Sequence, residues 1–495
     1  LPYPLRRQRQ MCIRDRLQAS AIFSVASIID AISNPLMGYL SDNFGKTRLG
    51  KRFGRRRFFI LLGIPLMMVY PLLWVEGFGF WYYLSTYVLF ELIYTSVMVP
   101  YETLATEMTT DFSARSKLTG YKAIFGKVAN FLAAFIPGQF ILIYGKESAE
   151  PFFFTALTYG VILCVAMIML YISSWERPVE ETTPVDEKKM TLAKTMVTLV
   201  RDMKSTFHLR VFRKHLGMYL CGFGAEWLFA SVFTYFIIFV LQYDPAMVAG
   251  LSSLNSLLQL FSTAIFIGIC VKHGFSKPYI LALSIVVFSV VCYSLLHFLH
   301  LPQQYATAAM LAITVVFGIG TGGVYYIPWT VYTFLADIDE AFTGRRREGI
   351  YAGAMTFSGK LMRSVIVFAM GAILSFYGFQ SKSQTQPESA VTAIALVFCV
   401  GVIALALMAM VFSHQMKLNR KTHLVVLGEV ARIKAGGLIG HVQPEVRAVM
   451  EELIGYPYEE CWGNSKVCRK IFDTPAVEVL PVAKPESLVS RTQHP

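Results

Sequence analysis

The sequence predicts an all-α polytopic membrane protein, and three observations support this fold class. The chain has 495 residues, of which 55% are hydrophobic and 16% charged, and its mean hydropathy is +0.51. A soluble globular chain is less apolar and more highly charged. Continuous apolar stretches long enough to cross a bilayer recur along the chain. Because backbone polar groups in lipid must be paired internally, we expect helices, and the continuous pattern argues against a β-barrel.

Windows of about 20 residues predict eleven membrane spans. They are 17–41, 58–76, 80–106, 119–145, 152–174, 215–242, 248–273, 278–299, 306–336, 349–378 and 390–414. The polar stretch 175–214, which contains ERPVEETTPVDEKK, separates five spans from six. We therefore expect an N-terminal transmembrane half (17–174), a cytosolic linker with a surface helix, a C-terminal transmembrane half (215–414) and a cytosolic tail (415–495).

Charge orients these spans. The basic residues of the loops on one side are Lys46, Arg48, Lys51, Arg52, Arg55, Arg56, Arg57, Arg115, Lys117, Lys272, Lys277, Arg345, Arg346 and Arg347. The opposite side offers little beyond Lys146 and Lys382. The positive-inside rule makes the first side the cytosol, and it also accounts for the net charge of +13 without a nucleic-acid partner.

Residues 1–16 break this rule. With eleven spans they would face outward, although they carry five arginines, and they lack the apolar core of a signal peptide. We expect that a twelfth, N-terminal helix is missing and that residues 1–16 are not native sequence. An apolar helix encoded upstream in the gene would confirm this expectation, and a verified native start at Leu1 would contradict it.

One additional helix would give six spans in each half, and the halves show an internal repeat. Val99–Lys127 (VPYETLATEMTTDFSARSKLTGYKAIFGK) ends one helix and begins the next, as does Ile327–Lys360 (IPWTVYTFLADIDEAFTGRRREGIYAGAMTFSGK). Both contain a Pro-aromatic pair, a Leu-Ala pair followed by an acid, a basic loop and a Gly-Lys. Chance similarity is the alternative. Such repeats are typical of secondary transporters, which bind substrate between the halves.

Two motifs carry a resemblance to a known family. IIDAISNPLMGYLSDN (28–43), followed by TRLGKRFGRRRFFIL (47–61), resembles the glycoside–pentoside–hexuronide:cation symporter family, a branch of the major facilitator superfamily. LADIDEAFTGRRREGIYAG (335–353) resembles the loop between the tenth and eleventh helices of the same family. The resemblance covers roughly residues 17–414. It implies transport of a sugar or glycoside coupled to Na⁺ or H⁺.

The resemblance also implies roles for individual residues. It places Asp30 in the cation site with Lys360 facing that site, and it puts Lys122 where the family has a sugar-contacting Arg. Trp329 and Thr356 fall near family sugar contacts. The chain departs from the pattern in three ways. Its second family aspartate is Asn34, Met98 stands where the family has an acid, and the first family helix is absent.

The physics of this site explains an aspartate within an apolar run. A charge in the bilayer centre costs several kcal/mol, so it faces a cavity or a partner. Asp30 and Asn34 are four residues apart and share one helix face. A pair between Asp30 and Lys360 would offset the burial of both charges, and a cation could compete with Lys360 for Asp30. The alternative is a static salt bridge that only holds two helices together.

The coupling ion follows from the number of carboxylates. Glu102 lies one turn after Met98 and either replaces the lost acid or pairs with Lys122. Na⁺ needs a cage of oxygens, whereas protonation needs a single carboxylate with a raised pKa, so a proton is favoured. Loss of coupling, which would leave a uniporter, is the alternative. The candidate cation-coupling residues are Asp30, Asn34, Glu102 and Lys360. The candidate substrate-binding residues are Asp30, Lys122, Trp329, Thr356 and Glu226.

Other signals fit less specific explanations. Glu91, Lys127, Asn130 and Arg363 are intramembrane polar residues that packed ion pairs explain almost as well as function. The eight cysteines show no metal-ligand spacing. GIGTGG (318–323) follows no strand and indicates close helix packing rather than a dinucleotide site. QPEVRAVMEELIG in the tail predicts a short amphipathic helix with Pro444 in its first turn.

The sequence as a whole predicts a twelve-helix major facilitator fold, with eleven helices represented, and substrate:cation symport by alternating access across a cytoplasmic membrane. We expect a monomer in the lipid bilayer that has a small-molecule substrate, no metal and no cofactor beyond the coupling H⁺ or Na⁺. One alternative is a lysophospholipid or other organic-solute carrier with the same fold. The alternative from another class is a non-transporting receptor or scaffold. An enzyme is not expected.

Overall fold

The computed structural model describes residues 36–75, 77–109, 111–144, 150–176, 200–299, 302–380 and 385–465, with a few helical positions between 22 and 34. Every regular element in these residues is a helix. Nine helices of the described part are long and apolar enough to cross a membrane. The predicted all-α fold is therefore confirmed.

In the described residues, the N-terminal half contains three long helices and one interrupted span, and most of the predicted span 17–41 lies outside them. Its elements are η1 (Phe44–Lys46), α2 (Arg48–Phe53), α3 (Arg57–Leu66), η2 (Met67–Trp74), α4 (Phe80–Met108), α5 (Phe112–Tyr144) and α6 (Glu150–Ser173). α3 continues directly into η2, which is a 3₁₀ helix. Pro65 and Pro71 explain this change, because proline has no backbone N–H to donate to the preceding turn.

The C-terminal half contains six spans, two of which include a π-helical turn. Its elements are α8 (Arg210–Tyr235), η4 (Phe236–Val240), α9 (Pro245–His273), α10 (Ser276–Leu299), α11 (Gln303–Thr343), α12 (Glu348–Phe376), α13 (Glu388–Leu396), η5 (Val397–Gly401) and α14 (Val402–His414). η4 and η5 are π turns that continue α8 and α13, so each span is unbroken.

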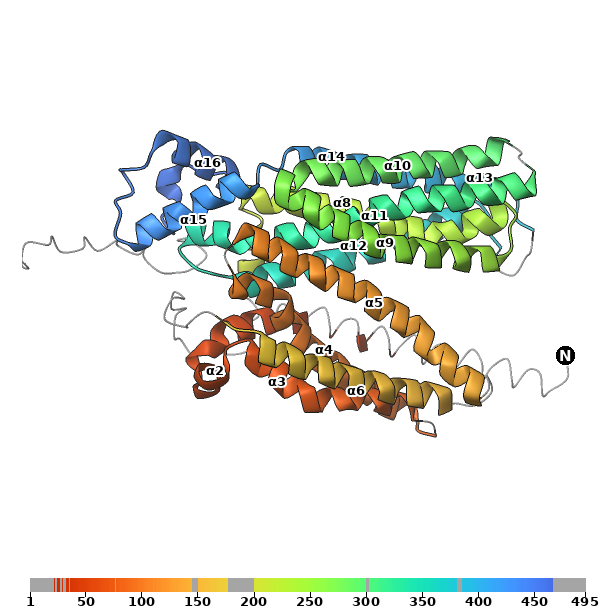
Figure 1. Ribbon diagram of the computed structural model, residues 1–495, viewed down its shortest axis with the longest axis horizontal. Coiled ribbons are helices and arrows are strands. Elements are labelled where there is room, and N and C mark those ends of the chain that lie inside the picture. The colour runs from red at the N-terminus through yellow and green to blue at the C-terminus, as the bar shows by residue number, and fades with distance from the viewer. Residues whose placement is uncertain are drawn as a thin grey trace, which may run out of the picture.

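The two halves lie side by side, with their helices roughly along the long axis of the molecule. Figure 1 shows the N-terminal half (red to yellow) below the C-terminal half (green to blue). α5 packs against α9 and α11 across the interface, and α12 packs against α4. Within the C-terminal half, α11 packs against α9 and α10, while α8 packs against α14 and α12.

The glycines of GIGTGG mediate this packing. A Cβ atom on Gly318 would lie 2.6 Å from Leu258 of α9, and one on Gly320 would lie 2.9 Å from the Ala282 carbonyl of α10. Cβ atoms are not accommodated at such distances, so only glycine lets α11 approach both neighbours this closely. The predicted role of this motif in helix packing is confirmed.

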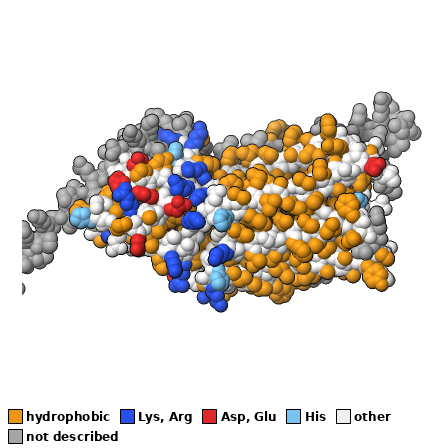
Figure 2. Space-filling model, turned by 90° about the horizontal axis from the view of Figure 1, so that it is seen from above, with side chains coloured by type: hydrophobic (Ala, Val, Ile, Leu, Met, Phe, Trp, Pro, Cys, Tyr) orange, Lys and Arg blue, Asp and Glu red, His pale blue; other side chains and the backbone are white. Residues whose placement is uncertain are grey.

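The surface separates an apolar belt from one charged end. Figure 2 shows hydrophobic side chains over most of the helical body and charged side chains gathered at one end. Large apolar side chains are strongly exposed on the helices, including Phe376 (85%), Phe368 (78%) and Ile172 (75%). Exposed apolar area on this scale needs lipid around it, so the protein is a multi-pass membrane protein. We call the charged end, at which α3, α5, α10 and α12 begin, the basic end.

The tail folds back onto the basic end. It forms α15 (Arg420–Lys434), α16 (Pro444–Ile454) and η6 (Tyr458–Glu460). The backbone N–H groups of Trp462 and Gly463 donate to the carbonyls of Ala341 (3.0 Å) and Phe342 (2.9 Å) at the end of α11. α16 begins with Pro444 in its first turn, as the sequence predicts.

Candidate functional site

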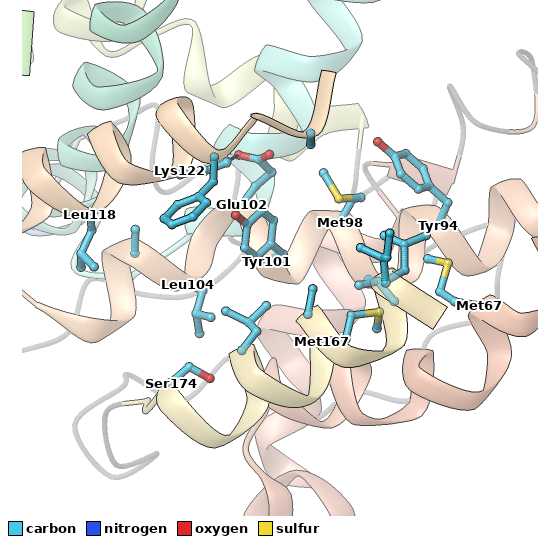
Figure 3. A pocket seen from close by; sticks show the side chains of 18 of the residues that line it. Met67, Tyr94, Met98, Tyr101, Glu102, Leu104, Leu118, Lys122, Met167 and Ser174 are labelled. Atoms are coloured by element: carbon cyan, nitrogen blue, oxygen red, sulfur yellow. Dashed lines mark hydrogen bonds and ion pairs between the residues drawn. The ribbon is translucent and has the colours of Figure 1, made fainter. Parts of the chain in front are cut away.

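An ion pair joins α4 to α5 where both approach the C-terminal half. The Lys122 ammonium donates to the carboxylate of Glu102, which lies two turns before the end of α4. Lys122 Nζ also lies 4.9 Å from the ring centroid of Tyr101 and 5.6 Å from that of Trp329, on α11. Figure 3 shows the Lys122 and Glu102 side chains directed toward each other. The aromatic faces and the carboxylate together stabilise the charge of the partly exposed lysine.

A cavity of about 810 Å³ adjoins this pair. Its walls come from η2, α4, α5 and α6, and from Trp329, Tyr332 and Thr333 of α11. The lining is mostly apolar, with side chains such as Met98 and Met167 in view in Figure 3. Among the described residues of its lining, Glu102 and Lys122 are the charged ones, so the described lining has one charged corner beside the other half and is mostly apolar elsewhere.

Aromatic side chains continue from this corner into the C-terminal half. The ring of Trp329 lies 5.9 Å from that of Tyr219 on α8, in an edge-to-face arrangement. Tyr219 also meets Trp227 edge-to-face at 6.4 Å, and Phe223 meets Tyr325 in the same way at 5.2 Å. These geometries are the ones that aromatic pairs favour. Trp329 therefore lies between the ion pair and an aromatic cluster of α8 and α11.

The structure brings three of the predicted site residues together and leaves the others apart. Glu102, Lys122 and Trp329 share the charged corner. Glu102 takes the second of the two predicted roles, since it pairs with Lys122. Asp30 lies outside the described residues, so its pairing with Lys360 stays a prediction.

The remaining candidates lie elsewhere on their helices. Asn34 is buried, with 6% of its surface exposed, and Glu226 is buried in the middle of α8. On α12, Thr356 is partly buried and Lys360 is exposed. None of these four residues lines the cavity of the charged corner. Among the described residues, these four therefore do not share the cavity with Glu102, Lys122 and Trp329, and their predicted roles stay predictions.

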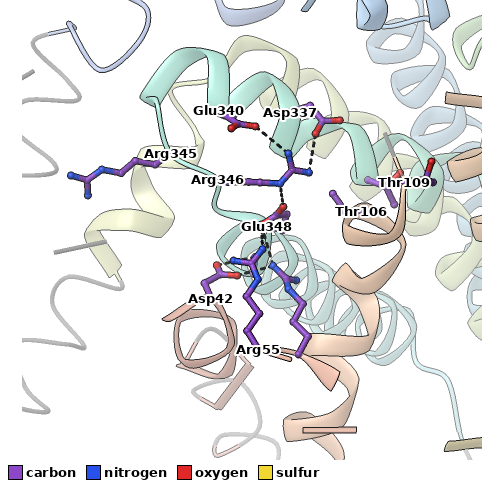
Figure 4. A network of polar contacts seen from close by, with 12 residues as sticks. Asp42, Arg55, Thr106, Thr109, Asp337, Glu340, Arg345, Arg346 and Glu348 are labelled. Carbon is purple, nitrogen blue, oxygen red and sulfur yellow. Dashed lines mark hydrogen bonds and ion pairs between the residues drawn. The ribbon is translucent and has the colours of Figure 1, made fainter. Parts of the chain in front are cut away.

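A network of buried charges at the basic end escaped the sequence prediction. Arg56, at the start of α3, bonds Asp42 at 2.9 Å and Glu348 of α12 at 3.1 Å. Asp42 also accepts the backbone N–H of Gly349 at 3.1 Å. Figure 4 shows Arg55 from the N-terminal half and Arg346 from the C-terminal half directed toward Glu348. The network thus ties the first basic loop to the start of α12.

A second part of the network is centred on Asp337 of α11. Asp337 bonds Arg115 of α5 at 2.6 Å, Arg346 at 3.0 Å and His423 of the tail at 2.9 Å. Arg115 and Asp337 are completely buried. Arg346 also contacts Glu348, which joins the two parts of the network (Figure 4). Both halves and the tail therefore meet in one set of ion pairs.

A neighbouring pair anchors the chain between α11 and α12. The Arg347 guanidinium donates to both oxygens of Asp339 (2.8 and 2.7 Å) and to the Ser205 hydroxyl. Burial acts to lower the pKa of Arg347, but the Asp339 charge and hydrogen bonds raise it above its ordinary value, so Arg347 stays charged. The bidentate geometry is the strong form of this interaction.

A sequence signal for this network existed. The run LADIDEAFTGRRREG places three acids before three arginines and a glutamate at a helix end, and the first half supplies matching charges at Asp42, Arg56 and Arg115. The positive-inside rule explains the arginines as cytosolic loop charges and predicts no ion-pair partners for them. The acids next to them, which the rule leaves unexplained, indicate pairing.

Comparison with known proteins assigns the family. The model of the family described as MFS/sugar transport protein matches residues 14–420. An uncharacterized symporter of Synechocystis sp., sll1374, is 25% identical over 463 residues, which cover 76% of this chain and 82% of that protein. The putative glycoside/cation symporter YagG of Escherichia coli is 24% identical over 389 residues (77% of this chain and 79% of YagG).

A solved structure shows the same fold. The proton:xylose symporter XylE, bound to 6-bromo-6-deoxy-D-glucose, superposes with a TM-score of 0.55 at 14% identity, over 80% of this chain and 86% of XylE. At this identity the likeness concerns the fold alone. The resemblance drawn from the two sequence motifs is confirmed. Since the family match covers most of the chain, the protein belongs to the sugar transport proteins of the major facilitator superfamily.

Proposed function

We propose that this protein is a sugar or glycoside:proton symporter that works by alternating access across a cytoplasmic membrane, with its basic end and tail in the cytosol. The family match and the glycoside/cation symporter among its relatives support a sugar substrate and cation coupling. The structural observation that carries the proposal is the Lys122–Glu102 pair beside Trp329, at the contact between the halves.

This corner has the chemistry that a sugar needs. A pyranose has an apolar face formed by C–H groups and an edge of hydroxyls. The Trp329 ring suits the apolar face. The Lys122 ammonium can donate hydrogen bonds to sugar hydroxyls, and the Glu102 carboxylate can accept hydrogen bonds from them. Because α11 carries Trp329 and α4 and α5 carry the pair, the sugar contacts both halves at once. A change in the relative position of the halves then changes its affinity.

Proton coupling in this proposal depends on Asp30. Its neighbour at the second acidic position of the family pattern is the neutral Asn34, which leaves one carboxylate on that helix face. A proton needs only that carboxylate, whereas Na⁺ prefers several oxygen ligands. Protonation of Asp30 would weaken any attraction to Lys360 and so change the contacts between helices of opposite halves.

The buried network is the element that alternating access would have to break. Arg56–Glu348 and Arg115–Asp337 link the halves at the basic end, which this structure therefore holds closed. Separation of the halves would expose these charges to water. Hydration would then replace part of the lost pairing energy, so the open form is accessible without leaving charges buried and unpaired.

Exchange in proteoliposomes tests the proposed substrate class, because exchange needs no gradient of the coupling ion. Vesicles containing the full chain are loaded with one of a panel of sugars and glycosides and exposed to labelled substrate, and a second panel contains lysophospholipids. We expect accumulation of label with at least one sugar or glycoside. Trp329→Ala should abolish it, and Trp81→Ala, which removes a 75%-exposed ring, should not. Exchange of lysophospholipids alone, or of neither class, would overturn the proposal.

A further inference from the structure

The short turn between α9 and α10 meets the junction between α14 and α15. A Cβ atom on Gly274, in this turn, would lie 3.3 Å from the Cβ of Asn419, which caps α15. The Ser276 hydroxyl donates to the carbonyl of Ser413 in α14, and the Ser413 hydroxyl donates to the Ser276 carbonyl at 3.1 Å. Two segments that are 137 residues apart in the chain are thus held together here.

Six basic side chains flank this contact, three from the ends of α9 and α10 and three from the segment that leads into α15. All six are exposed, and we call them the rim cluster: Lys272, His273, Lys277, Lys417, Arg420 and Lys421. The sequence contains no acidic residue between Asp244 and Asp337, nor between Glu388 and Glu429. Neither segment therefore supplies a counter-charge for the cluster.

An acid of the tail does not change this balance. Glu452 of α16 interacts electrostatically with Lys417, but it already accepts hydrogen bonds from Lys214 (3.0 Å) and Arg210 (3.3 Å). The rim cluster therefore holds like charges close together. Their repulsion opposes the contact between the α9–α10 turn and α15, and an anion placed among them would relieve it.

The rim cluster lies where three membrane spans end. The spans of α9, α10 and α14 have ends at His273, Ser276 and His414. Just inside these ends, Leu281 (49%) and Val411 (56%) are strongly exposed apolar side chains. Figure 2 shows Lys, Arg and His side chains at the border between the apolar belt and the basic end. The cluster is therefore at the depth of lipid headgroups.

α15 adds an apolar side chain to this border. Leu424 is 54% exposed and lies four residues after Arg420, so the two share one face of the helix. A small water-soluble anion would leave Leu424 in contact with water. A phospholipid offers a phosphate to the cations and apolar chains to the side chains next to them, so it fits both parts of the border.

We propose that the rim cluster binds the headgroup of an anionic phospholipid in the leaflet at the basic end. The headgroup lies between the α9–α10 turn and the start of α15 and holds the tail against the C-terminal half. His423, three residues after Arg420, bonds Asp337 at 2.9 Å, so the lipid supports the tail contact that reaches the network between the halves. None of the six cations lines the cavity of the charged corner, so the inference does not depend on the transported substrate.

Binding of a labelled lipid tests the proposal. Fluorescent phosphatidylglycerol is titrated into the full chain in detergent, and phosphatidylcholine with the same label is the neutral comparison. We expect the wild type to prefer phosphatidylglycerol. The triple variant Lys272→Gln, Lys277→Gln and Lys421→Gln should bind it about 10-fold more weakly, because each cation near an anionic headgroup contributes to binding. Arginine at the same three positions should retain the affinity.

The matched control removes three exposed cations of α2, which also lies at the basic end, by Arg48→Gln, Lys51→Gln and Arg52→Gln. This variant should bind phosphatidylglycerol like the wild type. Equal weakening in both triple variants would reveal a general surface attraction and overturn the proposal, as would unchanged binding in the first variant. Displacement of the lipid by millimolar inorganic phosphate would overturn the assignment to a lipid.

A photo-crosslinking amino acid locates the bound lipid. It is placed at Leu424, and the control position is Leu49, which is 49% exposed beside the cations of α2. In vesicles with equal amounts of the two phospholipids, the Leu424 probe should capture mainly phosphatidylglycerol, and the Leu49 probe should capture both in similar amounts. The same lipid ratio at both positions would contradict a specific site at the rim cluster.

Discussion

At the scale of single residues, the basic end depends on charges that have no access to water. All three guanidinium nitrogens of Arg115 donate, to the carbonyls of Thr106, Thr109 and Thr333 and to the carboxylate of Asp337. The guanidinium of Arg115 also lies 5.0 Å from the ring centroid of Phe334. Several contacts thus compensate for the burial of the Arg115 charge, and loss of the arginine leaves each of these partner groups without its hydrogen bond.

Removal of the arginine charge should destabilise the closed form. Arg115→Gln takes one partner from the buried Asp337 carboxylate, which we expect to cost about 3–5 kcal/mol. Thermal unfolding in detergent measures the effect, with Arg48→Gln at an exposed position as control. Equal melting temperatures for the two variants would show that Arg346 and His423 satisfy Asp337 without Arg115.

The charged corner gives a prediction for transport. Lys122→Met removes a charged hydrogen bond of the proposed sugar site and leaves Glu102 without this partner. The loss of roughly 1.5–3 kcal/mol would lower exchange about 10- to 150-fold. Lys122→Arg should retain part of the exchange, and Lys277→Met, which changes an exposed lysine, should retain all of it. Exchange at the wild-type rate in Lys122→Met would show that the Lys122–Glu102 pair does not bind the substrate.

At the scale of helices, the sequence predicts well which helices exist and in what order. It predicts poorly the residues at which they begin and end. α4 begins at Phe80, the predicted residue, but α11 extends seven residues beyond the predicted end at 336, to Thr343. The extension contains Asp337, Asp339 and Glu340, which the hydropathy window assigns to a loop. Arginines pair with these acids and keep them in the helix. Two of the arginines, Arg346 and Arg347, follow in the next loop, but Arg115 is 222 residues away from Asp337. Partners distant in the chain are not visible to a local window.

The contact between Gly38 and Gly349 should be sensitive to one methyl group. A Cβ on Gly349 would lie 2.5 Å from the Gly38 carbonyl oxygen and 2.8 Å from an Asp42 carboxylate oxygen. Gly349→Ala should therefore push the halves apart at the basic end and destabilise the closed form by about 1–3 kcal/mol.

The control for this prediction lies on the same helix. Gly371→Ala places its methyl in open space and should have no such effect. Maleimide labelling of Ser41→Cys, at a buried position beside the contact, reports opening of the basic end. Labelling that rises in Gly349→Ala and not in Gly371→Ala supports the prediction, and equal labelling refutes it.

The packing of η6 against α15 within the tail should loosen at acid pH. Burial acts to raise the pKa of Glu429, but hydrogen bonds from Arg432 and Tyr458 lower it overall, below the ordinary 4.5. A lowered folded-state pKa means that this stabilisation is present above pH 4.5 and is lost as the pH falls through the folded-state value.

Limited proteolysis of the tail between pH 7 and pH 3 measures this loss. Cleavage within α15 and α16 should increase as the pH falls below 4.5 in the wild type. It should already be high at pH 7 in Glu429→Gln. Glu445→Gln, at an exposed site of α16, should behave like the wild type. A pH profile that Glu429→Gln leaves unchanged would assign the effect to other carboxylates.

At the scale of the whole molecule, the sequence predicts two related halves but not how they meet. The hydropathy pattern and the internal repeat suffice for the topology. Arg56 and Glu348 are 292 residues apart, and nothing local to either residue indicates the other. The charged corner is similar: the sequence offers a Glu102–Lys122 pair as one of two alternatives, and Trp329 joins the pair only through the packing of the halves.

Substrate-driven proton movement tests the central claim of symport most directly. The full chain is reconstituted, the pH inside and outside the vesicles is recorded, and sugars and glycosides are added to the wild type and to Asp30→Asn. The account predicts that substrate addition alkalinises the external medium in the wild type and that Asp30→Asn abolishes this change. Substrate uptake without a pH change, undiminished in Asp30→Asn, would contradict the account and make the protein a facilitator.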